Sequence, residues 1–549
     1  MDIALHHRTA ITLDPQLTKP TVFNGAQLLI ECLYCHGVRH IFGMPGSHST
    51  YIYDAIKQHG GIQTILCRNE QAGAFMADGY ARTTGRPGVV CTTAGPGATN
   101  ALTGIAEAYA DSIPILLIAG QVNSDRIHQE CGRYHEVDLE GIFRPCVRFA
   151  GTVMHNEQIP SMVQFAFEAM VAARPGSAAL MLPQDLMAMP APDAPVNSPV
   201  ELRRVIPSKG SFEDLVRQAV ERISTSQRPL VIAGGGCISS GAGEQVEGLA
   251  LRLGCPVVTT LNGKGILDER SPLSFGHGRT RRARMVLSRA DLAIAVGCRF
   301  TEVFTASGTI PMPTRLIQID IDPKQIGMNY PVELGIVGDA RTILQALVAD
   351  LPHRDNSWEE IRRRARNAEQ LNPEWLIETL RSEVPEDSII FSDASEIGLR
   401  MQTDFPAYAP RTYFYPSNYA TLGWGLPAAI GAASAQSVRW TICVSGDGGF
   451  LMTAQELATA VRYKLKLVSI VHNDLTYGAI KGLQRARHQS RFVDIELNNP
   501  DFIRFGESFG VPCFRAPNSE QLVSSLRKAL RQDGPSLIEV PDKWRSMRL

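Results

Sequence analysis

The sequence predicts an α/β protein made of three doubly wound domains, each with a parallel sheet. Apolar, strand-like segments alternate with amphipathic, helix-like segments along the whole chain of 549 residues, as is typical of this fold class. A chain of this length is expected to hold about two to four domains. A proline-rich stretch and a charged stretch divide the alternation into three units, so we expect three domains.

The domain boundaries follow from these two stretches. The first, PAPDAPVNSP, is rich in proline and lacks periodicity, which predicts a linker. The second, HRDNSWEEIRRRARNAEQ, is charged and predicts a helical connector with a solvated face. We therefore expect a tail over 1–20, a first domain over 21–188, a linker over 189–205, a central domain over 206–352, a connector over 353–371 and a third domain over 372–549.

Each unit contains short apolar runs that predict buried strands. In the first domain they are 39–42, 64–67, 88–93, 115–119 and 179–183, with helices over 23–37 and 71–83. In the central domain the predicted strands are 229–233, 256–260, 292–296 and 316–321. In the third domain they include 440–444 and 465–471. The first and third units share a similar rhythm, without a repeat at the level of residues.

Composition excludes several classes of protein. The net charge is −1, so no overall field favours nucleic acid or a membrane surface. No apolar run is long enough to predict a membrane span, and residues 1–20 lack the pattern of a secretory signal. The 11 cysteines are scattered through apolar segments, which predicts buried thiols in a cytoplasmic enzyme. Cys32 and Cys35 form a CxxC pair without a second pair nearby, so we do not expect a metal or redox site there.

The turn Gly446-Asp447-Gly448-Gly449 follows a predicted strand and precedes a helix. Backbone N–H groups in such a turn can approach a phosphate closely. Asp447 would repel that phosphate unless a divalent cation lies between them, and Mg²⁺ is usually held by one or two carboxylates plus phosphates. The next predicted strand ends at Asp474, a natural second ligand, and the carbonyl of Thr476 is a candidate third. The motif predicts a diphosphate anchored through a metal, with a helix-capping Asp447 as the alternative.

With these residues the sequence resembles the thiamine diphosphate (ThDP) enzymes, in the branch of acetolactate synthase and 2-oxoacid decarboxylases such as benzoylformate decarboxylase, with benzaldehyde lyase nearby. Their motif begins GDG and commonly ends NN, where this chain has Asn473-Asp474. The resemblance covers nearly the whole chain. It extends to GMPGS (43–47), RNEQAGAFMADGYAR (68–82), TTAGPGATN (92–100), AYADSIPILLIAGQ (108–121) and YATLGWGLPAAIGA (419–432).

The resemblance implies roles for individual residues. Glu70 would be the catalytic carboxyl that activates the aminopyrimidine of ThDP, and Leu422 would support the bent cofactor. Asp447, Asp474 and the Thr476 carbonyl would bind Mg²⁺. The first domain would bind the pyrimidine of one cofactor and the third domain its diphosphate, in a homodimer or homotetramer with active sites between subunits. The implied cofactor-binding residues are Pro45, Glu70, Asn100, Ser395, Leu422, Gly446, Asp447, Gly448, Gly449, Asp474, Thr476, Tyr477 and Gly478.

Substrate-pocket residues are less well indicated. His48 and Gln121 are candidate catalytic residues, because polar side chains occupy these places in related lyases and carboligases. Tyr134-His135 stands where acetolactate synthases typically have Phe-Gln, which weakens a pyruvate-plus-pyruvate assignment. A structural role is the alternative for His48, Gln121 and His135. Lys481 and Gln484 either face the substrate or lie on an exposed helix surface.

The central domain raises the question of a dinucleotide. LVIAGGGCISSGA (230–242) lacks a full GxGxxG because Ser239 replaces the third glycine, and no acid ends the next strand, which argues against NAD(P). AGGG, VGCRF (296–300) and QIDIDP (318–323) resemble the FAD-binding segments of acetolactate synthases, although Thr301-Glu302-Val303 departs from their pattern. FAD is therefore a candidate cofactor. The alternative is a central domain without flavin, because many relatives keep this fold and bind none.

The resemblance implies decarboxylation of a 2-oxoacid, after which the resulting enamine passes to a carbonyl acceptor in a carboligase or to a proton in a decarboxylase. Two alternatives stay open. One is a ThDP-dependent C–C lyase, acting on a 2-hydroxyacyl-CoA or a hydroxyketone. The other is a non-catalytic regulatory subunit, which would have no need to keep Glu70, Asp447 and Asp474 together.

Overall fold

A computed structural model gives the fold of the chain and describes residues 23–129, 132–191, 209–354, 358–367, 374–436 and 438–542. Three separate six-stranded sheets lie in three units, and every pairing within these sheets is parallel. The prediction of three doubly wound α/β domains is confirmed. The expected tail over 1–20 lies outside the described residues, as does all of the linker over 189–205 except 189–191.

The first domain, residues 23–191, has the strand order β2-β1-β3-β4-β6-β5. Alternate residues of a strand face opposite layers: Val89 and Cys91 of β3 pack with α1, α2 and α6, whereas Val90 packs with α3 and α4. The strands are β1 His40–Gly43, β2 Gln63–Leu66, β3 Gly88–Thr92, β4 Ile115–Gln121, β5 Phe149–Thr152 and β6 Ala178–Pro183. The helices are α1 Gly25–Cys35, α2 Thr50–His59, α3 Glu70–Thr84, α4 Pro96–Asp111, α5 Leu139–Phe143, α6 Ile159–Val171 and α7 Gln184–Ala188.

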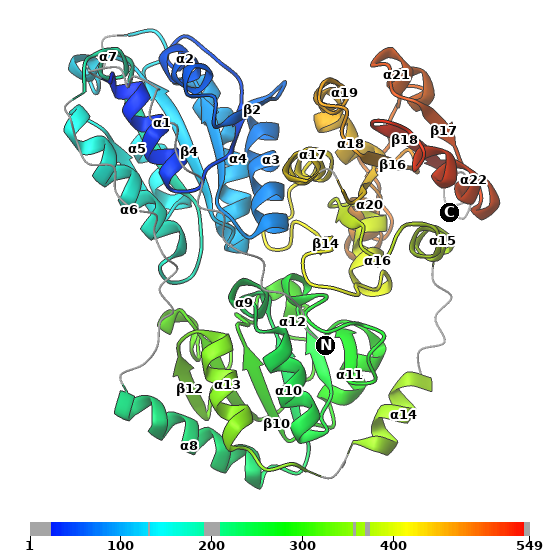
Figure 1. The fold of residues 1–549 in the computed structure, drawn as a ribbon. Coiled ribbons are helices and arrows are strands. Elements are labelled where there is room, and N and C mark those ends of the chain that lie inside the picture. The colour runs from blue at the N-terminus through cyan, green and yellow to red at the C-terminus, as the bar shows by residue number, and fades with distance from the viewer. Residues whose placement is uncertain are drawn as a thin grey trace, which may run out of the picture.

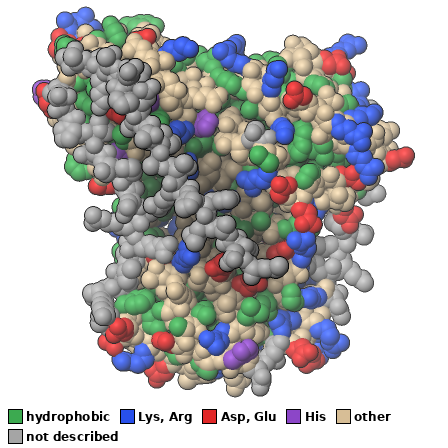
Figure 2. Space-filling view, viewed as in Figure 1, with side chains coloured by type: hydrophobic (Ala, Val, Ile, Leu, Met, Phe, Trp, Pro, Cys, Tyr) green, Lys and Arg blue, Asp and Glu red, His purple; other side chains and the backbone are tan. Residues whose placement is uncertain are grey.

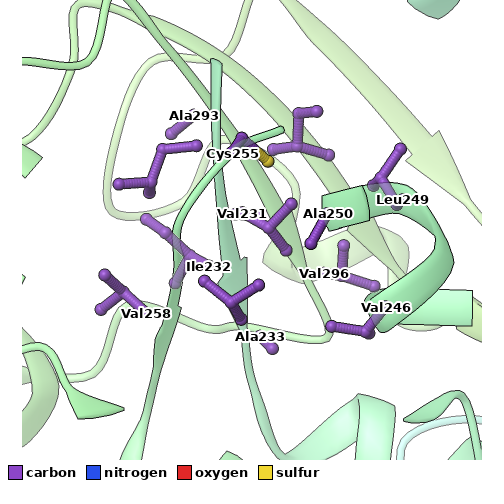
Figure 3. Close-up of a cluster of buried hydrophobic side chains, with 14 of the residues drawn as sticks. Val231, Ile232, Ala233, Val246, Leu249, Ala250, Cys255, Val258, Ala293 and Val296 are labelled. Atoms are coloured by element: carbon purple, nitrogen blue, oxygen red, sulfur yellow. The ribbon is translucent and has the colours of Figure 1, made fainter. Parts of the chain in front are cut away.

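The central domain, residues 209–367, has the strand order β12-β11-β10-β7-β8-β9. Strands β8 and β9 are added on one side of β7 and β10 to β12 on the other, so the strand order reverses between β7 and β10. Its core cluster includes Val231 and Ile232 of β7 and Val246 and Leu249 of α10, with Val231 on the side of the sheet that faces α10 (Figure 3). The strands are β7 Pro229–Ala233, β8 Val257–Thr259, β9 Ser274–His277, β10 Leu292–Val296, β11 Arg315–Asp320 and β12 Leu334–Val337. The helices are α8 Lys209–Thr225, α9 Gly235–Ser240, α10 Gly243–Leu253, α11 Arg281–Leu287, α12 Glu302–Thr305, α13 Ala340–Asp350 and α14 Glu359–Asn367.

The third domain, residues 374–542, has the order β14-β13-β15-β16-β18-β17, which repeats the topology of the first domain. The shared rhythm of the two units is therefore a shared fold. The strands are β13 Ile389–Ser392, β14 Tyr413–Phe414, β15 Thr441–Gly446, β16 Leu467–Asn473, β17 Cys513–Arg515 and β18 Ser536–Pro541. The helices are α15 Trp375–Glu383, α16 Glu396–Asp404, α17 Gly425–Ala435, α18 Asp447–Thr453, α19 Leu457–Arg462, α20 Gly478–His488, α21 Phe502–Ser508 and α22 Ser519–Ala529.

The first and third domains lie side by side and share one apolar core, with α3 packed against α17 (Figure 1). Two glycines allow this close approach. A Cβ atom on Gly79 would lie 2.0 Å from the Ala428 carbonyl oxygen, and one on Gly431 would lie 1.9 Å from that of Met76. Since any side chain at either position would collide with backbone, these glycines fix the spacing of the two domains.

The surface carries both signs of charge. Figure 2 shows Lys and Arg side chains interspersed with Asp and Glu over the face in view, in keeping with the net charge of −1. Within the part of the chain that the structure describes, no helix is both long and apolar enough to cross a membrane.

Candidate active site

Glu70 is the first residue of α3 and directly follows the turn after β2. Asn69 caps the helix by accepting a hydrogen bond from the Gln71 N–H at 2.8 Å. The Glu70 side chain is buried, and its Oε2 accepts a hydrogen bond of 3.1 Å from Nδ2 of Asn100, on α4. The structure thus places two of the predicted cofactor-binding residues in direct contact.

Two glycine turns lie beside Glu70. A Cβ atom on Gly97 would lie 3.0 Å from Glu70 Oε1 and 2.7 Å from Thr93 Cγ2, while one on Gly46 would lie 2.5 Å from Thr93 Cβ. The turn after β1 and the turn after β3 therefore meet at Thr93, at the same end of the sheet as Glu70. Pro45, in the first of these turns, is exposed.

His48 lies in the same region. Its buried ring has Nδ1 at 3.0 Å from Ser47 Oγ and 3.4 Å from Thr93 Oγ1, and it faces His135 at 5.5 Å between ring centroids. Burial and the neighbouring His135 lower the pKa of His48. A neutral imidazole is able to accept a proton from a substrate group. Tyr134 stacks on His135 at 3.8 Å, so the departure from Phe-Gln adds an aromatic imidazole pair beside His48.

Gln121, the last residue of β4, uses its amide for backbone contacts. Its Nε2 donates to the Val137 carbonyl at 3.3 Å, and its Oε1 accepts from the Val122 N–H at 2.9 Å. These bonds hold the segment that carries His135 against the end of β4. In this arrangement the Gln121 side chain has a structural role.

The glycine turn of the third domain brings together the predicted diphosphate-binding residues. A Cβ atom on Gly446 would lie 3.0 Å from Ser395 Cβ, and one on Gly448 would lie 2.6 Å from the Tyr477 ring. Each glycine is needed because another predicted residue packs directly on it. Because α18 begins at Asp447, the backbone N–H groups of its first turn lie at this glycine turn.

Asp447 is the first residue of α18 and is almost completely buried. Its Oδ1 accepts the Gly448 N–H at 2.9 Å, and its Oδ2 accepts the Leu475 N–H at 2.9 Å and Nδ2 of Asn499 at 2.6 Å. Burial, followed by the nearby charge of Asp474, raises the pKa of Asp447 to about 6. A divalent cation bound between these two buried carboxyls would offset their mutual repulsion.

Asp474 follows β16, which pairs with β15 in the register Gly446↔His472, so both acids lie at one sheet edge. Its Oδ1 accepts the Thr476 N–H at 3.2 Å, and burial raises its pKa. Among the described residues no group of three or more His, Cys, Asp or Glu side chains could hold a metal ion. A cation here would rely on two carboxylates completed by backbone and diphosphate oxygens, a donor set that suits Mg²⁺.

Three acids of the first domain hold the segment around Leu422, which is half-buried against the core of the third domain. Glu107 Oε2 accepts from the Thr421 N–H at 3.2 Å and from its hydroxyl at 2.7 Å. On either side, Asp111 accepts the Ser417 N–H at 2.9 Å and Asp78 accepts the Trp424 indole N–H at 2.6 Å. The guanidinium of the buried Arg82 forms ion pairs with Asp78 at 2.9 Å and Asp111 at 3.1 Å, and it lies 3.6 Å from Glu107, whose pKa burial raises to about 8.

Four residues at the site were not predicted from the sequence. Asn499 bonds both Asp447 and Asn473, and Asp393 accepts the Gly423 N–H at 3.1 Å. Glu396 lies beside Asp474, since its Oε2 is 2.6 Å and the Oδ2 of Asp474 is 2.9 Å from a Cβ atom placed on Gly478. Glu456 accepts the Arg68 N–H at 2.8 Å, two residues before Glu70. Of these, only Asp393 and Glu396 had a signal, because Asp393 directly follows an apolar strand and Glu396 begins the helix after it.

A cavity of about 380 Å³ lies where the central domain meets the other two domains. It is lined by the turns after β7 and β10, by the end of β11 and by residues of the first and third domains. The charged and polar lining residues include Arg82, Asp111, Arg174, Arg299, Asp320 and Asn418. Burial lowers the pKa of Arg174 to about 10 and raises that of Asp320 to about 6.

Comparison with known proteins identifies the three domains. The thiamine pyrophosphate (synonymous with thiamine diphosphate) enzyme N-terminal TPP binding domain matches residues 23–141, the central domain 216–347 and the C-terminal TPP binding domain 393–540. A probable acetolactate synthase large subunit of Methanococcus aeolicus is 33% identical, covering 94% of this chain and 91% of its own length. The acetolactate synthase isozyme 3 large subunit of Escherichia coli is 34% identical, with 93% of each chain covered.

A probable 2-ketoarginine decarboxylase of Pseudomonas aeruginosa is 34% identical, covering 96% of this chain and 95% of its own length. Carboligases and a decarboxylase are thus equally similar to the chain. The resemblance inferred from the motifs is confirmed, and the reading as a non-catalytic subunit is not supported by these relatives. The chain belongs to the thiamine pyrophosphate enzyme family and is a thiamine diphosphate-dependent carboligase or decarboxylase.

Proposed function

We propose that this enzyme uses thiamine diphosphate with Mg²⁺ to decarboxylate a 2-oxoacid and to deliver the remaining fragment to a carbonyl acceptor or a proton. The observation that carries the proposal is a pair of structured half-sites: Glu70 with Asn100 in the first domain, and Asp447 with Asp474 at the glycine turn of the third. When bound, the cofactor supplies the electron sink for cleavage of the bond next to the carbonyl.

The residues of the chain divide the remaining work. Glu70 holds a proton at its buried carboxyl for the pyrimidine ring, with Asn100 fixing its orientation. Asp447, Asp474 and the carbonyl of Thr476 hold the cation, and the N–H groups of the glycine turn hold the diphosphate. His48, neutral because of burial, moves a proton at the substrate. Leu422 supports the cofactor from a segment that is bonded on both sides.

The substrate is proposed to be a small molecule with a 2-oxoacid group, larger than pyruvate in its donor part. Tyr134 and His135 argue against pyruvate as both donor and acceptor, because the stacked pair lies beside His48 where the resemblance expects Phe-Gln. The similarity to a 2-ketoarginine decarboxylase, equal to that of acetolactate synthases, is consistent with it.

An NMR time course with thiamine diphosphate and Mg²⁺ tests the reaction type. We expect turnover of 2-oxoacids longer than pyruvate, with an aldehyde or a hydroxyketone as product. Acetolactate formed rapidly from pyruvate alone would overturn the assignment of a donor larger than pyruvate, but it would support the assignment as a carboligase. If every 2-oxoacid stays untouched while hydroxyketones or hydroxyacyl-CoA thioesters are cleaved, the enzyme is a lyase and the proposal fails.

The active unit is proposed to be a homodimer or a dimer of dimers, with each site completed by a second copy. In support, α20 has no buried residue and exposes Ile480 and Leu483, and Leu475 beside the metal acids is 45% exposed. The exposed apolar face formed by these three side chains would be buried by the partner. Sedimentation of Ile480→Asp/Leu483→Asp should show monomers without activity. A stable, active dimer of this variant would contradict the assignment.

The cavity of the central domain is the candidate FAD site. The three segments that resemble FAD-binding segments converge on it, through Gly235 and Gly236, through Arg299, and through Asp320. They lie at the carboxyl ends of β7 and β10, between which the strand order reverses, and this is where doubly wound sheets bind ligands. Flavin absorbance in the purified enzyme, lost in Arg299→Ala, would support FAD. A colourless enzyme that takes up no added FAD would contradict it.

A cytoplasmic location is also part of the proposal. All ten described cysteines are free, seven of them buried, as expected of thiols kept in a reducing compartment.

A further inference from the structure

Glu456 links the third domain to the turn that carries Glu70. The residue lies between α18 and α19, and its side chain is completely buried. Its Oε1 accepts the Arg68 N–H at 2.8 Å, and the Asn69 N–H also bonds to this carboxyl. Glu70 follows immediately, so both N–H groups that precede the proposed catalytic carboxyl are held by one side chain from the other domain.

Leu66 shows how the same surface covers the free edge of the first sheet. It ends β2, the edge strand, and its N–H donates to the Tyr463 hydroxyl at 2.9 Å. In a strand the N–H and C=O of one residue point to the same side, so the Leu66 carbonyl also faces the third domain. The Thr459 hydroxyl lies 3.0 Å from that carbonyl oxygen and is its partner.

The hydroxyl of Thr459 bears on whether the Glu456 carboxyl carries a proton. The Thr459 Oγ1 is also 2.7 Å from Glu456 Oε2, a hydrogen-bond distance, yet a hydroxyl has only one proton to donate. When that proton goes to the Leu66 carbonyl, a hydrogen bond between Thr459 and Glu456 Oε2 needs a proton on the carboxyl. Among the described residues no cation forms an ion pair with Glu456, and burial raises its pKa to about 7. Arg68 is the one charge that opposes this shift.

We propose that Glu456 is a positioning residue that acts as a neutral carboxylic acid, donating through Thr459 to Leu66 and accepting from the Arg68 and Asn69 N–H groups, and thereby fixes the Glu70 carboxyl. The inference rests on the proposed role of Glu70. A neutral group suits this place, because a charge so close to Glu70 would disturb the proton held there. The third domain thus orients the catalytic turn of the first domain within one chain.

The test compares Glu456→Gln, Glu456→Ala and, as a matched control, Tyr463→Phe, which loses the bonds to Leu66 and Thr64 at the same surface but leaves the turn intact. A glutamine amide can donate to Thr459 and accept from Arg68 as the neutral acid does. Two readouts are needed: amide hydrogen exchange over the turn in the protein without cofactor, and exchange of the thiazolium C2 proton of bound thiamine diphosphate.

We expect Glu456→Gln and Tyr463→Phe to keep both readouts close to wild type. Glu456→Ala should lose amide protection at Arg68 and Asn69 and slow C2-proton exchange roughly 10- to 100-fold, the usual effect of losing a group that orients an active residue. Should Glu456→Ala not fold, infrared spectra of wild type and Glu456→Gln decide, since only the wild type should show the carboxylic-acid carbonyl band of Glu456.

Any one of the following results would overturn the inference. The first is a Glu456→Gln variant as impaired as Glu456→Ala, which would mean that a charged carboxylate is required. The second is normal C2-proton exchange in Glu456→Ala while Glu70→Gln is slow, or the absence of the infrared difference. The third is normal exchange in Glu70→Gln itself, which removes the proposed role of Glu70 and is recognised as such because that variant leaves Glu456 in place.

Discussion

The Asp447 carboxylate accepts a hydrogen bond of 2.9 Å from the main-chain N–H of Leu475, the residue directly after Asp474. This bond ties the glycine turn that follows β15 to the end of β16. Asn499 reinforces it by donating to both Asp447 and Asn473. The two candidate metal ligands are therefore fixed relative to each other by the protein before any cation arrives.

Asp447→Ala should greatly weaken binding of the cofactor. We expect the affinity for Mg²⁺–thiamine diphosphate to fall roughly 100-fold or more. Even the loss of a group that only hydrogen-bonds to a metal ligand typically lowers metal affinity about 10- to 100-fold. Isothermal titration measures the loss. Glu520→Ala, which removes an acid in the first turn of α22, is the control and should bind normally. Equal affinities of the two variants would exclude Asp447 as a ligand.

Asp474→Asn introduces the residue that the family resemblance expects at this position. Removal of one of two adjacent buried charges should weaken the binding of Mg²⁺ alone, since an amide oxygen is a neutral ligand. The complete Mg²⁺–cofactor complex should still form, because the diphosphate supplies negative charge. A Mg²⁺ titration unchanged by the substitution would show that the Asp474 carboxylate takes no part in cation binding.

The stability of the cofactor-free protein should fall as the pH rises from about 5 to about 8. Burial raises the pKa of Glu107 to about 8 and that of Asp393 to about 7, so both are neutral in the folded state at pH values where the unfolded chain has lost these protons. The folded state then binds more protons, and the free energy of unfolding decreases with pH. Urea unfolding at several pH values measures the slope.

Glu107→Gln should flatten that slope, because glutamine keeps the acceptor for Thr421 and does not titrate. A slope as steep as that of the wild type would mean that Glu107 is ionised throughout, paired with Arg82.

The glycine contact between α3 and α17 should be intolerant of any side chain. Gly79→Ala places a Cβ atom 2.0 Å from the Ala428 carbonyl and should lower the free energy of unfolding by about 1–3 kcal/mol or more, as overpacking does. Gly248→Ala, within α10 and with no atom closer than 3.7 Å to the added Cβ, is the matched control and should stabilise by up to about 1 kcal/mol. Two variants of equal stability would show that the helices can separate freely.

The sequence predicted best what depends on local pattern. The bounds of β7 and β10 agree with the predicted strands, since their continuous apolar runs lie in the middle of a buried sheet. The edge strands β5, β9 and β12 were missed, because they are short and mix glycine or polar residues with apolar ones. At the site, Asp447 and Asp474 were found because each closely follows a predicted strand at a recognisable turn, and Glu70 because its segment resembles one that carries the catalytic glutamate of the family.

Contacts between distant segments could not be predicted. Asn499 is 52 residues from Asp447 and lies outside any motif, and Glu456 bonds Arg68 across 388 residues of chain. Such pairings depend on the packing of whole domains, which no local pattern encodes. The same holds for Gln121, whose amide is used by the backbone of Val137 rather than by an open pocket.

Exchange of the thiazolium C2 proton of bound thiamine diphosphate for deuterium from deuterated buffer, followed by NMR, tests the role of Glu70 most directly. Wild type should exchange rapidly, whereas Glu70→Gln should bind Mg²⁺–thiamine diphosphate with near-normal affinity and exchange at least ~100-fold more slowly, the scale of a lost acid–base contribution. Equal exchange rates in the two proteins would contradict the assignment of Glu70 as the group that activates the cofactor.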